Sequence, residues 1–407
     1  MGVLLLLAAQ DKDKDKKSDA SLWEHIPFDQ WVKEGPKEQI PCKLRMWNAG
    51  LGIYQRLEAH IDLQIDGADL VKRGPKGQVI ALVEITDSSG KTYRDEGKLE
   101  MAEIKPATRN SDVVLSWDAF VVPGEYNITA TLYHSVTREH SLVQRRLVIP
   151  APGHDPLPNS WRDLPNVEFW DPSRLPEPDA LFRPEIDGKL HLPLVTRHPV
   201  QIDVLADFTT TDVFLGSHQA FLEYLHVVLP TMKALSQIDL KNGALNIATL
   251  DMEKKQVSFE QDGVRELDWA RLKKTIKGTD PSMVSVQALK VRQPSPVFLR
   301  DEMVRRISAK PTTAGGQHED PRRILIVLSG PLGFYNFGGM PPVQIPEQCD
   351  CRIYYLQYDF SVKQAAFGDI GHFEKMLKPL KIRSFSVRSP QDVRDALAKM
   401  LKEIAEM

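Results

Sequence analysis

The periodicity of the apolar residues changes once along this 407-residue chain, within a proline-rich stretch at residues 150–199. Before this stretch, apolar residues alternate with polar ones. After it, short apolar runs alternate with segments of helical spacing. Period-two alternation indicates strands with one face on a core, whereas strand–helix alternation indicates a parallel sheet covered by helices. The chain is also long enough to bury two cores. The sequence therefore predicts a multidomain protein that combines two fold classes.

The first half, residues 22–150, has the pattern of an antiparallel β-sandwich. In Leu57–Ile65 every odd position is apolar and every even position is polar, which is typical of a half-buried strand. Gln78–Ile85 is a more continuous apolar run that suits an inner strand. Turn residues at Asp87–Gly90 and Pro123–Glu125 separate such strands. The pattern resembles immunoglobulin-like and fibronectin-like modules, and a spacer or stalk is the favoured role.

Residues 151–198 are rich in proline and show neither helical nor strand periodicity. They are interpreted as an extended linker that lies partly against one domain, because large aromatic side chains provide anchors at Trp161, Phe169 and Trp170. Within this linker, Lys189–Val195 is a candidate edge strand, where its proline would be tolerated.

The second half, residues 199–407, predicts a doubly wound α/β domain with a mostly parallel sheet. Val200–Phe208 is an apolar strand, Ser217–Leu235 has apolar residues at helical spacing, and Arg323–Leu328 is the most apolar strand. Near-continuous apolar strands indicate a sheet covered by helices on both faces. A hairpin at Ala244–Glu260 adds one antiparallel strand, which we expect at an edge.

A candidate metal site follows the first strand of this domain. Asp207, Thr209 and Thr211 place one carboxylate and two hydroxyls where ligands bind in open parallel sheets. Oxygen ligands of this kind suit a hard divalent cation. The sequence here resembles the von Willebrand factor A (vWA) family, whose metal-ion-dependent adhesion site (MIDAS) opens with Asp-x-Ser-x-Ser. The resemblance implies a Rossmann-like fold and Mg²⁺ or Mn²⁺. A structural alternative is that Asp207 and Thr209 only satisfy backbone groups of the turn.

Two later positions test this resemblance. Thr279, in a Gly-Thr-Asp sequence, matches a further ligand of the family. The family's last ligand is the aspartate of Thr-Asp-Gly, but here Ser329 takes the threonine's place and Gly330 the aspartate's. The resemblance therefore implies a degenerate site with weaker affinity, unless Asp280 or Asp359 supplies the missing carboxylate.

A long loop at Gly330–Gln348 follows the most apolar strand and carries Phe334, Tyr335 and Phe337 among glycines and prolines. Long loops on a rigid scaffold often bind other molecules. These aromatic residues are therefore a candidate interaction surface, with a lid over the domain's own core as the alternative.

The first 21 residues are expected to lie outside the folded part. Val3–Ala9 is a short apolar run that matches the core of a secretory signal peptide, although no positive segment precedes it. Seven apolar residues are too few to cross a bilayer. Asp11–Lys17 then alternates in charge and reads as part of a solvated tether. The chain is accordingly expected to be exported, either secreted or held in the periplasm or cell envelope. A frayed cytosolic terminus is the alternative.

The three cysteines, Cys42, Cys349 and Cys351, lack metal-ligand spacing. In a strand, Cys349 and Cys351 would lie on one face, where such neighbours rarely form a disulfide without strain. They are interpreted as small buried apolar residues.

The charge distribution and the motif content argue against several functional classes. The formal net charge is −3 and the charges are interspersed, so no basic surface for nucleic acid is predicted. There is no nucleophile elbow, no Walker sequence and no paired histidine motif, so an enzyme is not expected. The favoured hypothesis is a non-catalytic, exported module of the cell envelope that binds a protein partner. The alternatives are divalent-metal-dependent adhesion and a structural subunit of a larger assembly.

Overall fold

The computed structural model describes residues 22–47, 49–170, 186, 188–208, 218–276, 295–308, 320–330, 351–358 and 380–407. The chain forms two compact units. Of the described residues, the first unit takes 22–51, 56–154 and 164–170. The second takes 52–55, 155–163 and those from 186 onward. Residues of the predicted linker therefore belong to both units. Within the described ranges, none of the helices has the length and apolar character needed to cross a membrane.

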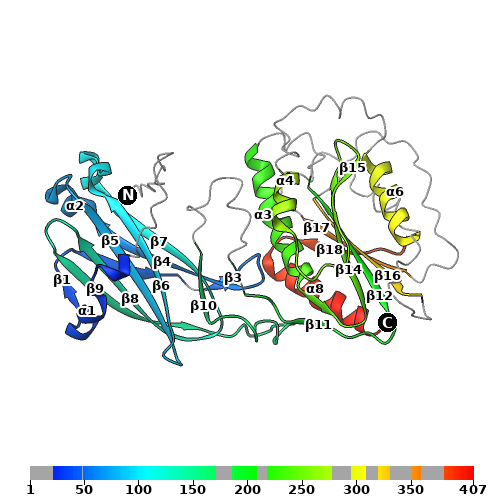
Figure 1. Ribbon diagram of the computed structural model, residues 1–407, viewed down its shortest axis with the longest axis horizontal. Coiled ribbons are helices and arrows are strands. Elements are labelled where there is room, and N and C mark those ends of the chain that lie inside the picture. Colours follow the sequence, from blue (N-terminus) through cyan, green and yellow to red (C-terminus); the bar gives the residue numbers. More distant parts are fainter. Residues whose placement is uncertain are drawn as a thin grey trace. The chain divides into compact units, whose positions relative to one another are not determined.

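The first unit contains two antiparallel sheets (Figure 1). One sheet has the order β1 (Lys37–Glu38), β9 (His140–Ile149), β8 (Gly124–His134), β5 (Gln78–Asp87) and β6 (Thr92–Glu100). The other has the order β10 (Val167–Trp170), β7 (Asp112–Val121), β4 (Leu57–Asp66) and β2 (Cys42–Met46), and β3 (Gly50–Leu51) also pairs with β4. The alternation predicted for β4 is confirmed, because its buried apolar residues are Leu57, Ala59, Ile61, Leu63 and Ile65.

Two contacts show how the sheets of this unit are covered. Trp117 of β7 packs against Gly97 of β6. A Cβ added to Gly97 would lie 3.4 Å from the Trp117 ring, so the two sheets approach each other closely at this point. On the outer face of the β5 sheet, Trp31 of helix α1 (Phe28–Glu34) packs in one apolar cluster with Ile80 and Leu82. β5 is therefore covered on both faces, which explains its continuous apolar run.

Short helical segments complete the first unit. They are α2 (Gly67–Arg73) and the 3₁₀ turns η1 (Leu22–Glu24), η2 (Met101–Glu103) and η3 (Pro106–Asn110). Helix α2 begins at Asp66, whose carboxylate accepts hydrogen bonds from the backbone N–H groups of Ala68 and Asp69. It ends before Gly74, whose φ of 81° favours glycine.

The turn between β5 and β6 is organised by the carboxylate of Asp87. Its Oδ1 accepts hydrogen bonds from Ser89 Oγ at 2.6 Å, from Ser89 N at 2.9 Å and from Lys91 N at 3.0 Å. Its Oδ2 accepts from Asn166 Nδ2 at 2.7 Å and from Tyr93 Oη at 3.2 Å. The side-chain donors Ser89 and Asn166 make the largest contributions that hold the pKa of Asp87 well below its usual value.

We expect Asp87→Ala to lower the free energy of unfolding at pH 7 by about 1.5–3 kcal/mol, because it removes the charged acceptor of five hydrogen bonds. A carboxyl whose folded-state pKa is depressed stabilises the protein fully only above its unfolded-state pKa, and this stability is lost as the pH falls. The difference from wild type should therefore shrink as the pH falls below about 4. Urea unfolding of the wild type and of Asp87→Ala at neutral and acidic pH measures this difference in the free energy of unfolding. An equal difference at both pH values would contradict the assignment.

The second unit is built on a six-stranded sheet. Its order is β15 (Gln256–Gln261), β14 (Gly243–Asp251), β12 (Val200–Asp207), β16 (Arg322–Ser329), β17 (Cys351–Tyr358) and β18 (Arg383–Val387). All neighbours are parallel except β14 and β15, so the antiparallel edge strand is confirmed. A smaller parallel pair joins β11 (Leu192–Leu194) to β13 (Ile238–Leu240), and the predicted proline-containing strand is thereby confirmed as well.

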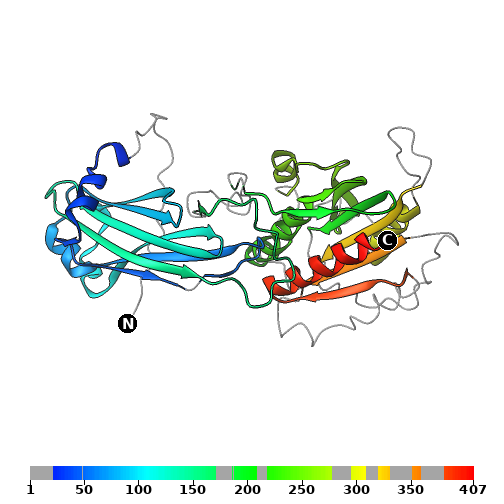
Figure 2. The same ribbon diagram turned by 90° about the horizontal axis from the view of Figure 1, so that it is seen from below.

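Helices lie on both faces of the large sheet (Figure 1). Helix α6 (Ser295–Ser308) covers one face, where its Leu299 and Met303 cluster with Leu205 of β12 and Leu325 of β16. Helices α3 (His218–Ser236) and α8 (Pro390–Ala405) lie on the opposite face, and α8 runs beside β18 (Figure 2). The short helix α4 (Trp269–Ile276) contacts β15.

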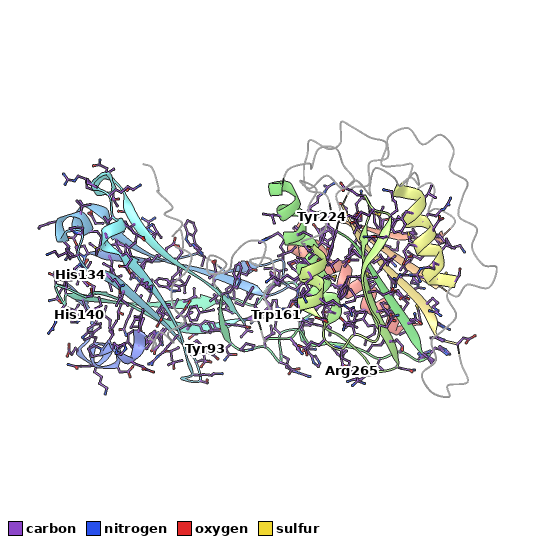
Figure 3. The ribbon with its side chains drawn as sticks, turned by 45° about the horizontal axis from the view of Figure 1, so that its top comes forward. Tyr93, His134, His140, Trp161, Tyr224 and Arg265 are labelled. Atoms are coloured by element: carbon purple, nitrogen blue, oxygen red, sulfur yellow. The ribbon has the colours of Figure 1, made fainter. Side chains whose placement is uncertain are left out.

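A buried arginine attaches a segment of the predicted linker to this second unit. The guanidinium of Arg394, on α8, donates hydrogen bonds to Asp155 Oδ1 at 2.6 Å and to Oδ2 at 2.7 Å. The same guanidinium lies 4.4 Å from the ring centroid of Trp161, a residue labelled in Figure 3. Trp161 Nε1 donates to the carbonyl oxygen of Gln55 at 2.7 Å, and Gln55 Nε2 donates to that of Pro390 at 3.0 Å. Trp161 is therefore a buried anchor, as its residue type predicted.

One cysteine, Cys351, differs from the interpretation made from the sequence. Cys351, the first residue of β17, is disulfide-bonded, so its interpretation as an unbridged apolar residue is wrong. Cys42 of β2 is free, and burial followed by the charge of Glu38 raises the pKa of its thiol to about 11. Cys349 lies outside the described residues.

Candidate functional site

The parallel strands of the second unit bring the ends of β12 and β16 side by side. Ala206 pairs with Leu328 in the β12–β16 register, so the next residues, Asp207 and Ser329, lie beside each other at the carboxyl edge. Asp207 also pairs with Leu250, close to the end of β14. In open parallel sheets this is the edge where ligands bind. Asp207 therefore lies at this edge, and its role as a metal ligand stays a prediction.

Asp207 and Ser329 form the centre of the candidate site. Both residues are buried, and Asp207 is only 2% exposed. Ser329 Oγ lies 3.4 Å from Asp207 Oδ2 and 3.0 Å from the carbonyl oxygen of Gly330. The hydroxyl has one proton and can donate it to only one of these acceptors at a time. A carboxylate and a hydroxyl at this separation are hard oxygen groups that a divalent cation can use as ligands.

Tyr224 of helix α3 joins the two strand ends (Figure 3). Its hydroxyl donates a hydrogen bond to the carbonyl oxygen of Asp207 at 2.6 Å and accepts one from the backbone N–H of Gly330 at 3.1 Å. Burial, and then the charge of Asp207, raises the pKa of Tyr224 well above its ordinary value, so the hydroxyl remains protonated. Tyr355 Oη adds a 3.4 Å hydrogen bond to the carbonyl oxygen of Gly330.

The ring of Tyr224 packs against Gly330. A Cβ added to Gly330 would lie 3.2 Å from Tyr224 Cε2, which is tighter than an ordinary contact. A larger residue at position 330 would therefore require the ring to shift by a few tenths of an ångström.

The turn between β14 and β15 adds charge to the same edge. Asp251, 1% exposed, accepts backbone hydrogen bonds from Glu253 and Lys254, and its Oδ2 lies 3.0 Å from Lys254 Nζ. Burial lowers the pKa of the neighbouring Lys255, while the charges of Asp251, Glu253 and Asp207 oppose this shift. A protonated Lys255 reduces the negative potential at Asp207 and would weaken cation binding.

The other predicted site residues lie outside the described residues; they are Thr209, Thr211, Thr279, Phe334, Tyr335 and Phe337. The metal site and the aromatic interaction surface predicted from them therefore stay predictions. Among the residues that the structure does describe, no group of three or more His, Cys, Asp or Glu side chains is arranged to hold a metal ion.

The sequence analysis missed Tyr224, Tyr355 and Lys255. Tyr224 follows Leu222 within the apolar stripe of a helix and looks like a core residue in the sequence. Its position in the site depends on strand ends that are distant in the chain, since Gly330 is 106 residues away.

No protein-family model matches the chain, and no curated protein matches it. Among solved structures, proximal thread matrix protein 1 from the mussel byssus is 13% identical, with a TM-score of 0.25, covering 52% of this chain and 48% of its own. A form of that protein with a zinc-occupied MIDAS motif gives a TM-score of 0.23. The putative ApaA protein from Bordetella pertussis is 10% identical, with a TM-score of 0.18, covering 28% of this chain and 98% of its own.

The chain thus spans about half the length of the mussel protein that it matches.

Proposed function

We propose that this chain is a non-catalytic, exported protein-binding module of the cell envelope. In this proposal the second unit is a vWA-like domain that contacts the partner through the carboxyl edge of its sheet, and the first unit is a β-sandwich spacer. The observation that carries the proposal is the Tyr224 hydroxyl, which ties the ends of β12 and β16 together beside Asp207. Such a bridge holds the bases of the following loops in fixed positions, as a recognition surface requires.

Metal-dependent adhesion is the second candidate, and the 3.4 Å separation of Asp207 Oδ2 and Ser329 Oγ favours it. Asp207 and Ser329 would supply two oxygen ligands to Mg²⁺ or Mn²⁺. The ion, when bound, would take a carboxylate oxygen from the partner protein as a further ligand. Asp207 and Ser329 would then hold the ion in position, and the partner would need an exposed carboxylate to bind it.

We expect the full chain, after treatment with a chelator, to bind Mg²⁺ or Mn²⁺ and to lose this binding in Asp207→Ala. At an ion concentration of about 100 times Kd, binding should stabilise the wild type by about 2.7 kcal/mol. Isothermal titration calorimetry and thermal melting measure both effects. Asp262→Ala is the control, because Asp262 is exposed and follows β15, whose chain direction places it away from the candidate site.

The outcomes separate the two candidates. Ion binding that disappears only in Asp207→Ala would support metal-dependent adhesion. If neither ion binds to the wild type, a metal-dependent mechanism is excluded and the partner contact must form without an ion. Affinity capture from envelope proteins of the native host, with wild type and Asp207→Ala compared, then tests the binding function. Hydrolytic turnover that is abolished by Asp207→Ala would contradict the non-catalytic proposal.

A further inference from the structure

The first unit carries a row of aromatic and polar side chains across the outer face of one sheet. The odd-numbered residues of β4 are buried in the core, so its even-numbered side chains lie on the opposite face. In the register of this sheet, His60 pairs with Asp118, and Asp118 pairs with Trp170. Trp47 extends the β2–β4 register, because its N–H donates to the carbonyl oxygen of His60 at 3.0 Å. The row of these four residues crosses three strand spacings, about 14 Å.

The part of this row near Trp47 is open to solvent. Trp47 is 58% exposed, and the side chains of His60 and Asp118 are 41% and 37% exposed. Trp170, at the other end, is half-buried and lies 6.3 Å from the ring of Phe120. Apolar surface gains free energy when it is removed from water, so the exposed indole of Trp47 favours a ligand that covers it.

His60 lies between two carboxylates and carries a positive charge. Its Nδ1 is 2.7 Å from Asp118 Oδ1, and its Nε2 is 2.9 Å from Asp62 Oδ1. A neutral imidazole has one N–H group, so both contacts are hydrogen bonds only when the ring is protonated. Burial opposes this charge, but the hydrogen bond and charge of Asp118, together with those of Asp62, raise the pKa of His60 above its ordinary value.

The same carboxylates hold Trp47 in place and leave an acceptor open. Asp62 Oδ2 accepts a hydrogen bond from Trp47 Nε1 at 3.1 Å, and Asp62 Oδ1 accepts one from Ser116 Oγ at 2.7 Å. The indole is therefore oriented before any ligand arrives, which lowers the entropic cost of binding. Asp118 is bonded to His60 through Oδ1, so its Oδ2 is an exposed acceptor for a hydroxyl group.

The charges on this face balance. Arg45 of β2 shares the face, because it pairs with Asp62 in the register, and Lys43 lies two residues earlier on the same strand. Three cations stand against three carboxylates there, and these groups are Lys43, Arg45, His60, Glu58, Asp62 and Asp118. A face with balanced charges does not select an ion, because a charged ligand would lose hydration without finding a net counter-charge.

An exposed aromatic ring beside fixed hydrogen-bonding groups fits the chemistry of a sugar. A pyranose ring has an apolar C–H face that can cover an indole, and hydroxyl groups at its edge that both donate and accept hydrogen bonds. Small-molecule sites are usually concave, whereas the outer face of a sheet is open. A chain of sugars that lies across the strands therefore fits this face better than a single small molecule.

We propose that the outer face of this sheet binds a neutral polysaccharide. The indole of Trp47 stacks on the C–H face of one sugar ring, and Asp118 Oδ2 accepts a hydrogen bond from a hydroxyl group. His60 and Asp62 are positioning residues that hold Asp118 and Trp47. The first unit is then a binding unit as well as a spacer, and this inference does not depend on the carboxyl edge of the second unit.

The test uses the full chain and neutral soluble polysaccharides, namely dextran, galactomannan, arabinoxylan and mixed-linkage β-glucan. Native gel electrophoresis should show that at least one of them retards the wild type, and isothermal titration calorimetry then gives the affinity. Trp47→Ala should weaken this binding about tenfold or more, because it removes the stacking surface. Asp118→Ala should weaken it about tenfold, because a hydrogen bond to a charged acceptor is lost.

The control is Val148→Ala on the other sheet of the same unit, where Val148 is 55% exposed, and it should leave the affinity unchanged within about twofold. Trp47→Phe keeps an aromatic face and should bind more tightly than Trp47→Ala. Thermal melting checks that each variant is folded.

Two outcomes would overturn the proposal. The first is that none of the polysaccharides binds, or that Trp47→Ala binds them as wild type does. The second is that choline, a cation that tryptophan also attracts, binds at Trp47 while the polysaccharides do not. Asp207→Ala should bind the polysaccharides as wild type does, so this test stays separate from that of the proposed function.

Discussion

A chain in which Arg394 is replaced by methionine should have a free energy of unfolding about 3–5 kcal/mol lower than that of the wild type. The Arg394 guanidinium is buried, and its partner Asp155 has only 8% of its side chain exposed. Removal of the arginine takes its positive charge away from this buried carboxylate. It also removes hydrogen bonds to Ser160 Oγ at 2.8 Å and to the carbonyl oxygen of Leu157 at 2.9 Å. Urea unfolding, followed by tryptophan fluorescence, measures the loss.

The matched control for Arg394→Met is Lys402→Met, an exposed position on the same helix, where the change should be about 0.5 kcal/mol or less. In the double variant Arg394→Met with Asp155→Asn, the loss should be smaller than the sum of the single losses, because both substitutions remove one interaction. Equal losses for Arg394→Met and Lys402→Met, or strict additivity with Asp155→Asn, would contradict a buried ion pair.

Arg306→Met is the second substitution with a large expected effect, again about 3–5 kcal/mol. Arg306 lies on α6, is 4% exposed at its side chain and contacts three carboxylates. Its Nε lies 2.8 Å from Glu302 Oε1, its Nη2 lies 2.6 Å from Glu260 Oε1, and its Nη1 lies 3.4 Å from Asp203 Oδ1. Burial alone would raise the pKa of Glu302, but Arg305 and Arg306 lower it below its ordinary value. Without Arg306, these carboxylates lose their central cation.

The neighbouring Arg305 provides a control that shares a partner with Arg306. Arg305 Nη2 lies 2.6 Å from Glu302 Oε1, but 54% of its side chain is exposed. Exposed ion pairs contribute little because solvent screens them, so Arg305→Met should cost less than about 1 kcal/mol. Urea unfolding of both variants gives the comparison. If Arg305→Met and Arg306→Met lower the free energy of unfolding by the same amount, burial does not determine the strength of these ion pairs.

Features that depend on local pattern could be predicted from the sequence. The alternation in β4 correctly indicated its buried face, and the continuous run in β5 reflects cover on both faces. The cover by α1 was not predicted, because Trp31 and Phe28 occupy only one short helix with little periodicity. Cys351 was misinterpreted, because spacing alone does not determine whether a thiol is oxidised.

In the candidate site, too, the local sequence pattern predicted some features and not others. Asp207 could be placed because it ends an apolar strand, and strand ends meet at one edge of a parallel sheet. The bridge through Tyr224 could not be predicted, because its two partners lie 17 and 106 residues away in the chain. Hydrogen bonds between such distant residues are a property of the tertiary structure, so the periodicity of the sequence does not predict them.

The hydrogen bond between Gln55 and Pro390 has a consequence for how the protein is made, since it joins residues 335 positions apart. Residues 52–55 emerge from the ribosome early, yet they belong to the same unit as α8. The first unit can fold during translation, while the second must wait for α8 before its earliest residues find their partners. Contacts of such high sequence separation slow folding, so the second unit should complete its structure only after α8 has been synthesised. No single cut in the chain separates the two units, and a fragment that begins at Pro199 would leave Arg394 without Asp155.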